Sequence, residues 1–131
     1  MPIAPREEQL NSFLEKLPSG PVTMLNLLKF KEKAVYADGR ESNLSGAEAY
    51  GLYGLEVGKM IQADGGRTVF AAATNTLVIG EGELKWDMVA IAEYAGLESF
   101  QKIMSSPEYQ EIAKHREAGL AHQLLINLKT G

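Results

Sequence analysis

One segment, Val22–Phe30, constrains the fold more than any other feature of this sequence. It reads VTMLNLLKF and carries apolar side chains at both odd and even positions. A strand with one face in water alternates apolar and polar residues, whereas a strand covered on both sides does not. We therefore expect this segment to be a central strand of a sheet that is buried on both faces.

The rest of the chain shows alternating helix and strand patterns. A short helix opens at Pro5 and ends at the proline- and glycine-rich residues 18–21. Ser45 and Glu48 form a capping-box pattern at the start of a helix over residues 46–64. The remaining predicted elements are strands over 67–79, 86–94 and 122–129, a helix from 96 that restarts at Ser106 and Pro107 and ends at Gly119, a polar surface loop over 31–45 and a turn at 80–83.

This order predicts a ferredoxin-like α+β fold, βαββαβ, with an extra N-terminal helix. In that fold a four-stranded antiparallel sheet carries two helices on one face. We expect one domain over residues 1–131, made of an N-terminal helix and linker (1–19) and the ferredoxin-like unit (20–130). Because the strands are apolar on both faces, the sheet face without helices needs a cover. We expect a homodimer that packs sheet against sheet.

The helix over residues 46–64 contains three interior glycines on one predicted face. Each glycine costs about 1 kcal/mol relative to alanine, so a close approach to a strand or a ligand is expected there. The predicted inward face consists of Ala47, Tyr50, Gly51, Gly54, Gly58 and Ile61.

Composition excludes several classes of function. The 131 residues include no cysteine, which excludes thiolate metal sites, disulfides and cysteine nucleophiles. Lys and Arg number 13 against 17 Asp and Glu, and no basic stripe indicates a nucleic acid partner. No apolar run approaches the roughly 18 residues of a membrane span, and the N-terminus MPIAPREEQL is not a signal peptide. We expect a cytoplasmic protein with no nucleic acid or membrane partner.

Cofactor motifs are also missing. Residues 80–83 (GEGE) lack the lysine and hydroxyl residue that follow a phosphate-binding loop. Gly65 and Gly66 stand between a helix and a strand, which is the wrong order for a dinucleotide fingerprint. A turn separates His115 from His122, so no metal-ligand spacing is present. We expect no cofactor and no metal.

Asn26 is the first candidate for chemistry. It stands among leucines in the buried strand, on the face of Val22, Met24, Leu28 and Phe30. A buried amide needs hydrogen-bond partners. Either it points into a pocket and orients a substrate carbonyl, with Phe30 lining the wall, or it makes a structural bond to a neighbour.

Aromatic residues provide a second group of candidates. Tyr50 and Tyr53 lie three residues apart on one helix, and Tyr109 points inward from the last helix. A phenol can donate a hydrogen bond inside an apolar pocket, or it can be a core residue with its hydroxyl at the surface. Trp86 opens a predicted strand and either lines a flat ligand or closes the end of the barrel.

His115 and Arg116 follow the apolar stripe of the last helix. Histidine is an acid–base group near neutral pH, but His115 stands among charges, where a solvated helix face is the alternative. Arg116 either holds a ligand carboxylate at the pocket mouth or pairs with a nearby acid.

Four stretches together resemble a known family. They are residues 20–30 (GPVTMLNLLKF), Tyr50 and Tyr53 ahead of Gly65–Gly66, Glu81–Gly82 ahead of Trp86–Asp87, and residues 106–110 (SPEYQ) followed by Arg116. The set resembles the small bacterial family called domain of unknown function 1330, in the dimeric α/β barrel superfamily. The resemblance covers about residues 20–128, and the first helix and the 31–45 loop lie outside a minimal version of the domain.

The resemblance implies the ferredoxin-like fold and the sheet-to-sheet dimer, but no assigned reaction. The wider superfamily is similar in fold to haem-degrading and quinone-forming monooxygenases, muconolactone isomerases and haem-dependent chlorite-degrading enzymes, which share a pocket between helices and sheet. The haem-degrading relatives use an asparagine, a tryptophan and a histidine together. Asn26 and Trp86 are of those types, but His115 is not placed as an iron ligand would be.

Two functions follow from these observations. In the first, the dimer binds or transforms a small, apolar, oxygen-bearing molecule, by cofactor-free oxygenation or isomerisation if it is an enzyme. Asn26 and Tyr50 polarise the oxygen, Arg116 holds an acidic group, and His115 is available for proton transfer. In the second, the protein is a non-catalytic stress-associated or regulatory dimer whose pocket is filled by its own side chains.

Overall fold

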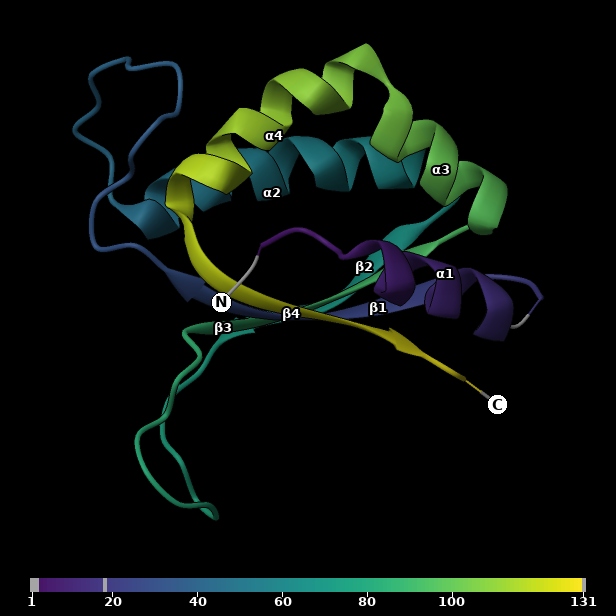
Figure 1. Ribbon diagram of the computed structural model, residues 1–131, viewed down its shortest axis with the longest axis horizontal. Coiled ribbons are helices and arrows are strands. Elements are labelled where there is room, and N and C mark those ends of the chain that lie inside the picture. Colours follow the sequence, from purple (N-terminus) through teal and green to yellow (C-terminus); the bar gives the residue numbers. More distant parts are fainter. Residues whose placement is uncertain (1–2, 18, 131) are drawn as a thin grey trace.

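The sheet has four antiparallel strands with β1 in its interior. A computed structural model describes residues 3–17 and 19–130 (Figure 1). The strands pair in the order β2-β3-β1-β4, so β1 has a neighbour on each side. This is the ferredoxin-like arrangement that the element order predicted. The strands are β1 (Val22–Phe30), β2 (Arg67–Ala73), β3 (Met88–Tyr94) and β4 (Leu120–Leu128).

The helices lie on one side of this sheet (Figure 1). They are α1 (Glu7–Lys16), α2 (Gly46–Ala63), α3 (Leu97–Ser105) and α4 (Pro107–Gly119). The predicted caps are confirmed, because Ser45 and Glu48 form the capping box of α2 and the Ser106 hydroxyl caps α4. The first helix begins at Glu7 rather than at Pro5, and Pro18, part of its predicted stop, lies outside the described residues.

The core lies between β1 and the helices. Val22, Met24 and Leu28 alternate along β1, are almost fully buried, and pack against the inward side of α2. The α2 residues in this core are Tyr50, Tyr53, Val57 and Ile61. The N-terminal helix adds a further layer, because the rings of Phe13 in α1 and Phe100 in α3 meet edge to face at 5.9 Å.

The other face of the sheet is apolar and carries no helix (Figure 1). The register places Leu25 of β1 between Ile91 and Ile126, and Leu27 between Val89 and Leu124. Phe70 on β2 lies beside Ile91 and is 56% exposed. We call this surface the open face, and its members are Leu25, Leu27, Phe70, Val89, Ile91, Leu124 and Ile126.

Three predicted strand boundaries are wrong. β2 ends at Ala73 rather than at residue 79, β3 begins at Met88 rather than at Trp86, and β4 begins at Leu120 rather than at His122. Asp87 explains the boundary of β3, because its carboxylate accepts a hydrogen bond from the Phe30 N–H at 2.9 Å. The Asp87 carboxylate thus replaces the backbone carbonyl that a continuing strand would offer to Phe30. Residues 74–87 form a long connection instead of a tight hairpin.

The predicted inward face of α2 is wrong in part, because only Tyr50 and Ile61 of that set are buried. Ala47 and Gly51 are exposed, and a Cβ atom on Gly51 or Gly54 would meet no atom within 4 Å. The close approach occurs instead where α2 begins and α4 ends. A Cβ on Gly46 would lie 2.0 Å from the Lys31 carbonyl oxygen, and one on Gly119 would lie 2.3 Å from the Gly46 carbonyl oxygen. Only glycine fits at this crossing.

The loop over residues 31–45 is not purely a surface loop. Ala34 and Tyr36 are buried in a second small core with Ala49 and Ala118. The Val35 N–H donates a hydrogen bond to the Ala118 carbonyl at 3.0 Å, which fastens the loop to the end of α4. The loop therefore closes over the junction of α2 and α4.

The crossing of α2 and α4 gives a stability prediction. We expect Gly119→Ala to lower the free energy of unfolding by about 1–3 kcal/mol or more, because its Cβ meets backbone that cannot rotate away. Gly51→Ala is the matched control and should raise stability by about 1 kcal/mol, since its Cβ meets open space. Urea unfolding followed by circular dichroism measures both. Equal effects of the two substitutions would contradict the crossing.

Candidate functional site

Four tyrosines meet between the helices and the sheet. Tyr50 and Tyr53 come from α2, Tyr94 from the end of β3 and Tyr109 from α4; we call them the tyrosine cluster. The first three are buried and Tyr109 is half-buried. The rings of Tyr50 and Tyr53 lie 5.2 Å apart, and the hydroxyls of Tyr53 and Tyr109 share a hydrogen bond of 3.1 Å. The ring of Phe30 lies 5.4 Å from that of Tyr50.

Burial keeps these phenols neutral. Removal from water raises the pKa of Tyr50 to about 12, and the nearby Arg116 guanidinium opposes part of that rise. Burial also raises the pKa of Tyr53 and that of Tyr94 well above the ordinary value for tyrosine. Near neutral pH the three phenols are therefore hydrogen-bond donors and not bases. Within the described residues, the hydroxyls of Tyr50 and Tyr94 make no hydrogen bond.

Asn26 lies beside this cluster on the inward face of β1 and forms part of a hydrogen-bonded chain. Its Nδ2 donates to the Ala90 carbonyl at 3.2 Å, and its Oδ1 accepts from Gln123 Nε2 at 2.8 Å. Arg116 Nη2 donates to Gln123 Oε1 at 2.5 Å and also to the Ile3 carbonyl. The chain therefore runs from the middle of the sheet through α4 to the N-terminal segment, and the amide of Asn26 bonds to neighbours at both ends.

His115 lies apart from the tyrosine cluster. Its Nδ1 shares a hydrogen bond of 2.7 Å with the hydroxyl of Tyr36, and the two rings meet edge to face. His115 thus joins α4 to the 31–45 loop. Arg116, its neighbour, points to the N-terminal segment, so adjacent residues of α4 fasten two different segments of the chain.

Trp86 is not brought together with the other candidates. It lies in the connection between β2 and β3, where its carbonyl accepts a hydrogen bond from Thr74 Oγ1 at 2.6 Å. In the described part of the chain, no ring contact joins Trp86 to the tyrosine cluster. The asparagine, tryptophan and histidine therefore do not converge on one point.

Three residues of these networks were not predicted. Alternation along β3 from Met88 places Tyr94 on the inward face, so the strand pattern contained that signal. The same alternation along β4 places Gln123 opposite Leu28 and inward. Tyr36 had no such signal, because it stands in a polar segment without periodicity.

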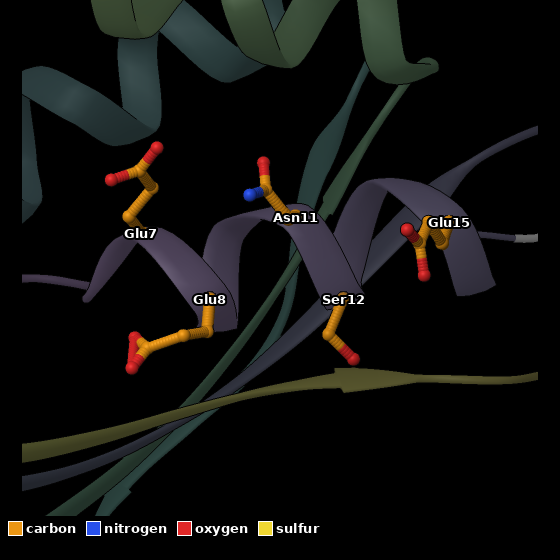
Figure 2. Close-up of a pocket in the computed structure, with 5 residues that line it drawn as sticks. All are labelled: Glu7, Glu8, Asn11, Ser12 and Glu15. Atoms are coloured by element: carbon orange, nitrogen blue, oxygen red, sulfur yellow. The ribbon is translucent and has the colours of Figure 1, made fainter.

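Two open hollows lie along α1. Figure 2 shows one of about 550 Å³, lined by polar side chains of α1 that point to different sides of the helix. Its residues are Glu7, Glu8, Asn11, Ser12 and Glu15. A second hollow, of about 440 Å³, lies between α1 and β4 and is more apolar. We call it the α1–β4 groove, and it is lined by Glu8, Gln9, Ser12, Phe13, Lys16, Leu125, Ile126 and Asn127.

Across residues 3–17 and 19–130, no group of three or more histidine, aspartate or glutamate side chains is arranged to hold a metal ion. Within the same part of the chain, no helix has the length and apolar character needed to cross a membrane.

The buried phenols predict a loss of stability at alkaline pH. The folded pKa of Tyr50, about 12, lies above the value near 10 of an unfolded tyrosine. The contribution of Tyr50 to the free energy of unfolding is complete below pH 10. It is lost as the pH rises toward 12, by up to about 1.4 kcal/mol per pH unit. We expect Tyr50→Phe to flatten this decline in urea unfolding measured from pH 9 to 11.5. An unchanged slope would show that the phenol is not buried in solution.

Comparisons with known proteins agree with this geometry. A crystal structure of RPA0582, a protein of unknown function from Rhodopseudomonas palustris, is similar at 35% identity and a TM-score of 0.84, covering 98% of this chain and 95% of that one. A dimeric ferredoxin-like protein of unknown function from Thermobifida fusca has 13% identity and a TM-score of 0.53, covering 85% of this chain and 92% of that one. SnoaB, a cofactor-independent oxygenase from Streptomyces nogalater, has 14% identity and a TM-score of 0.50, covering 86% of this chain and 96% of that one. The last two share the fold alone.

The family match is less extended than the resemblance in the sequence. No curated protein matches this chain. The match covers residues 35–127, so β1 lies outside it, whereas residues 35–45 of the loop that we placed outside a minimal domain lie within it. That loop carries Tyr36, whose burial against α2 and α4 makes it part of the core. This chain belongs to the family described as domain of unknown function (DUF1330).

Proposed function

We propose that this protein is a homodimer that binds a small, apolar, oxygen-bearing molecule between the helices and the sheet. The observation that carries the proposal is a pair of buried tyrosines, Tyr50 and Tyr94, whose hydroxyls have no hydrogen-bond partner in the described residues. Neither hydroxyl oxygen is a fully buried atom without a partner, so each keeps some contact with solvent. A ligand oxygen can accept hydrogen bonds from these hydroxyls in place of water, and the neighbouring rings of Phe30 and Tyr53 hold an apolar body.

The chemistry of the cluster favours binding over proton transfer. Neutral phenols polarise a carbonyl oxygen by donating to it, but they do not abstract a proton near neutral pH. His115 is bonded to Tyr36, and Arg116 is bonded to Ile3 and Gln123. A cofactor-free oxygenation or isomerisation therefore needs a ligand that ionises readily by itself. In this proposal Asn26 and Arg116 stabilise the wall of the site and do not react.

Access to the cluster follows from the same contacts. Arg116 donates a hydrogen bond to the Ile3 carbonyl of the N-terminal segment, and Ile3 packs against the core. Movement of this segment opens a path between α4 and β4. We infer that a ligand enters there.

The homodimer is supported by the open face of the sheet. Apolar side chains of all four strands lie on it, and a contiguous apolar surface of this kind marks an interaction site. The fold is shared with a protein from Thermobifida fusca that is itself dimeric. Packing of two open faces buries β1 on both sides, as its sequence requires.

A second function has its own support. Two open hollows lie around α1, and the rings of Tyr50, Tyr53 and Tyr109 pack against one another. A filled interior is what a non-catalytic stress-associated or regulatory dimer requires. Such a protein dimerises but takes up no ligand.

The ligand proposal is tested with a matched pair of probes, acetophenone and ethylbenzene, which share size and shape but differ in the oxygen. We expect acetophenone to bind at least about tenfold more tightly, since only the ketone pairs with the two hydroxyls. The double variant Tyr50→Phe, Tyr94→Phe should lose this preference. Tyr36→Phe is the control and should keep it, because its hydroxyl bonds to His115 outside the cluster. Isothermal titration calorimetry measures the affinities.

Failure of acetophenone and ethylbenzene to bind, in a protein that is a stable dimer, supports the second function. An equal preference for the ketone in wild type and in the double variant overturns the roles given to Tyr50 and Tyr94.

The dimer is tested on the open face. Phe70→Glu places a charge on that face, and we expect it to convert the protein to monomer at micromolar concentration with its fold intact. Val35→Glu is the control, because Val35 is 62% exposed on the 31–45 loop, away from the sheet. Sedimentation velocity and circular dichroism give the mass and the fold. A wild-type monomer, or a dimeric Phe70→Glu variant, would contradict the packing.

A further inference from the structure

The connection between β2 and β3 is a projecting, apolar arm. Residues 74–87, which we call the β2–β3 arm, leave the sheet on the side away from the helices (Figure 1). Val78 is 85% exposed and Ile79 is 92% exposed, with Leu77 and Leu84 also exposed beside them. Isolated apolar residues are common on surfaces, but four on one projecting segment mark a contact surface.

The base of this arm is firmly held. Thr74 and Asp87 pair through the Thr74 N–H and the Asp87 carbonyl at 2.9 Å, and the Asp87 N–H donates to the Leu28 carbonyl at 2.8 Å. The Asp87 carboxylate also holds the Phe30 N–H and the Lys29 ammonium group. The arm is therefore directed by the central strand itself, and its apolar tip is held away from its own core.

The direction and length of the arm fit a second copy of this chain. Two sheets packed face to face lie about 10 Å apart. Each leg of the arm has about six residues, which span roughly 20 Å when extended. An arm that leaves the open face therefore passes the edge of the partner's sheet and reaches the partner's helix layer.

We propose that the tip of the β2–β3 arm packs into the α1–β4 groove of a second copy. This inference rests on the proposed homodimer. The groove lies at the β4 edge of the sheet, where Phe13, Leu125 and Ile126 give it an apolar floor. Leu125 is exposed in the single chain although it lies on the helix side of β4. Val78 and Ile79 of the partner cover it.

Both surfaces carry charges of each sign. The groove carries Glu8 at one turn of α1 and Lys16 at its end. The arm carries Glu81, Glu83 and Lys85 beside its apolar tip, so Lys85 is available to Glu8 and a glutamate is available to Lys16. By two-fold symmetry the contact forms twice and closes the dimer, which leaves no arm free to recruit a third copy.

Cross-linking tests the contact directly, because the chain has no cysteine of its own. We expect the double variant Ile79→Cys, Leu125→Cys to form a covalent dimer on mild oxidation, seen by non-reducing electrophoresis. The comparison pair is Ile79→Cys, Leu55→Cys, since Leu55 is an exposed leucine on α2. Stronger cross-linking in the comparison pair, or none in either pair, would overturn the contact with the groove.

A second measurement tests the contribution of the arm. We expect Val78→Asp, Ile79→Asp to raise the dimer dissociation constant about 100-fold, since each of the two contacts loses buried apolar surface. Val35→Asp is the control and should change the dimer dissociation constant less than about twofold. Sedimentation equilibrium measures the constant.

The outcomes separate the two proposals. A monomeric wild-type protein removes the homodimer itself. A dimeric wild type whose dissociation constant is unchanged in Val78→Asp, Ile79→Asp overturns the arm contact alone and leaves the sheet-to-sheet dimer and the ligand site in place.

Discussion

β1 carries apolar side chains toward both faces of the sheet, and only one of those faces is covered by the chain's own helices. On the helix side, Val22, Met24 and Leu28 are almost fully buried. On the other side, Leu25 and Leu27 lie among apolar residues of the neighbouring strands. Burial of apolar surface is the dominant favourable term in folding, at about 25 cal/mol per Å². A single chain thus leaves part of this stabilisation unused, and the proposed sheet-to-sheet dimer supplies the missing layer.

The helix layer depends on the crossing at Gly46 and Gly119. Their backbones approach so closely that no side chain fits between them. This contact brings α2 and α4 together over the sheet and thereby brings Tyr50 and Tyr53 of one helix next to Tyr109 of the other. The phenols occupy an apolar interior, where burial raises the pKa of Tyr53 and Tyr50. A donor that stays neutral can hold an oxygen atom without reacting with it.

The fold could be predicted from the sequence because several local signals agreed. The Val22–Phe30 run, the Ser45 and Glu48 capping box and the Ser106 cap each depend on residues close together in the chain. The site was less predictable, since it depends on which helix face turns inward. Glycine gives no hydrophobic signal, so Gly51 and Gly54 were assigned to the buried face whereas the tertiary contact uses Gly46 and Gly119. Trp86 was misplaced because Asp87, a side chain, completes the backbone pairing of Phe30.

Successive residues of β1 serve opposite sides of the sheet. Asn26 bonds to Ala90 and Gln123 on the helix side, while Leu25 and Leu27 belong to the open face. The same backbone therefore positions the amide chain beside the tyrosine cluster and the proposed dimer contact. Asp87 extends this connection, because it bonds to Leu28 and Phe30 at the end of β1 and directs the β2–β3 arm. A partner that fixes the arm and the open face also fixes β1, which forms the floor of the proposed ligand site. This shared strand is a physical reason for the proposed binding and dimerisation to depend on each other.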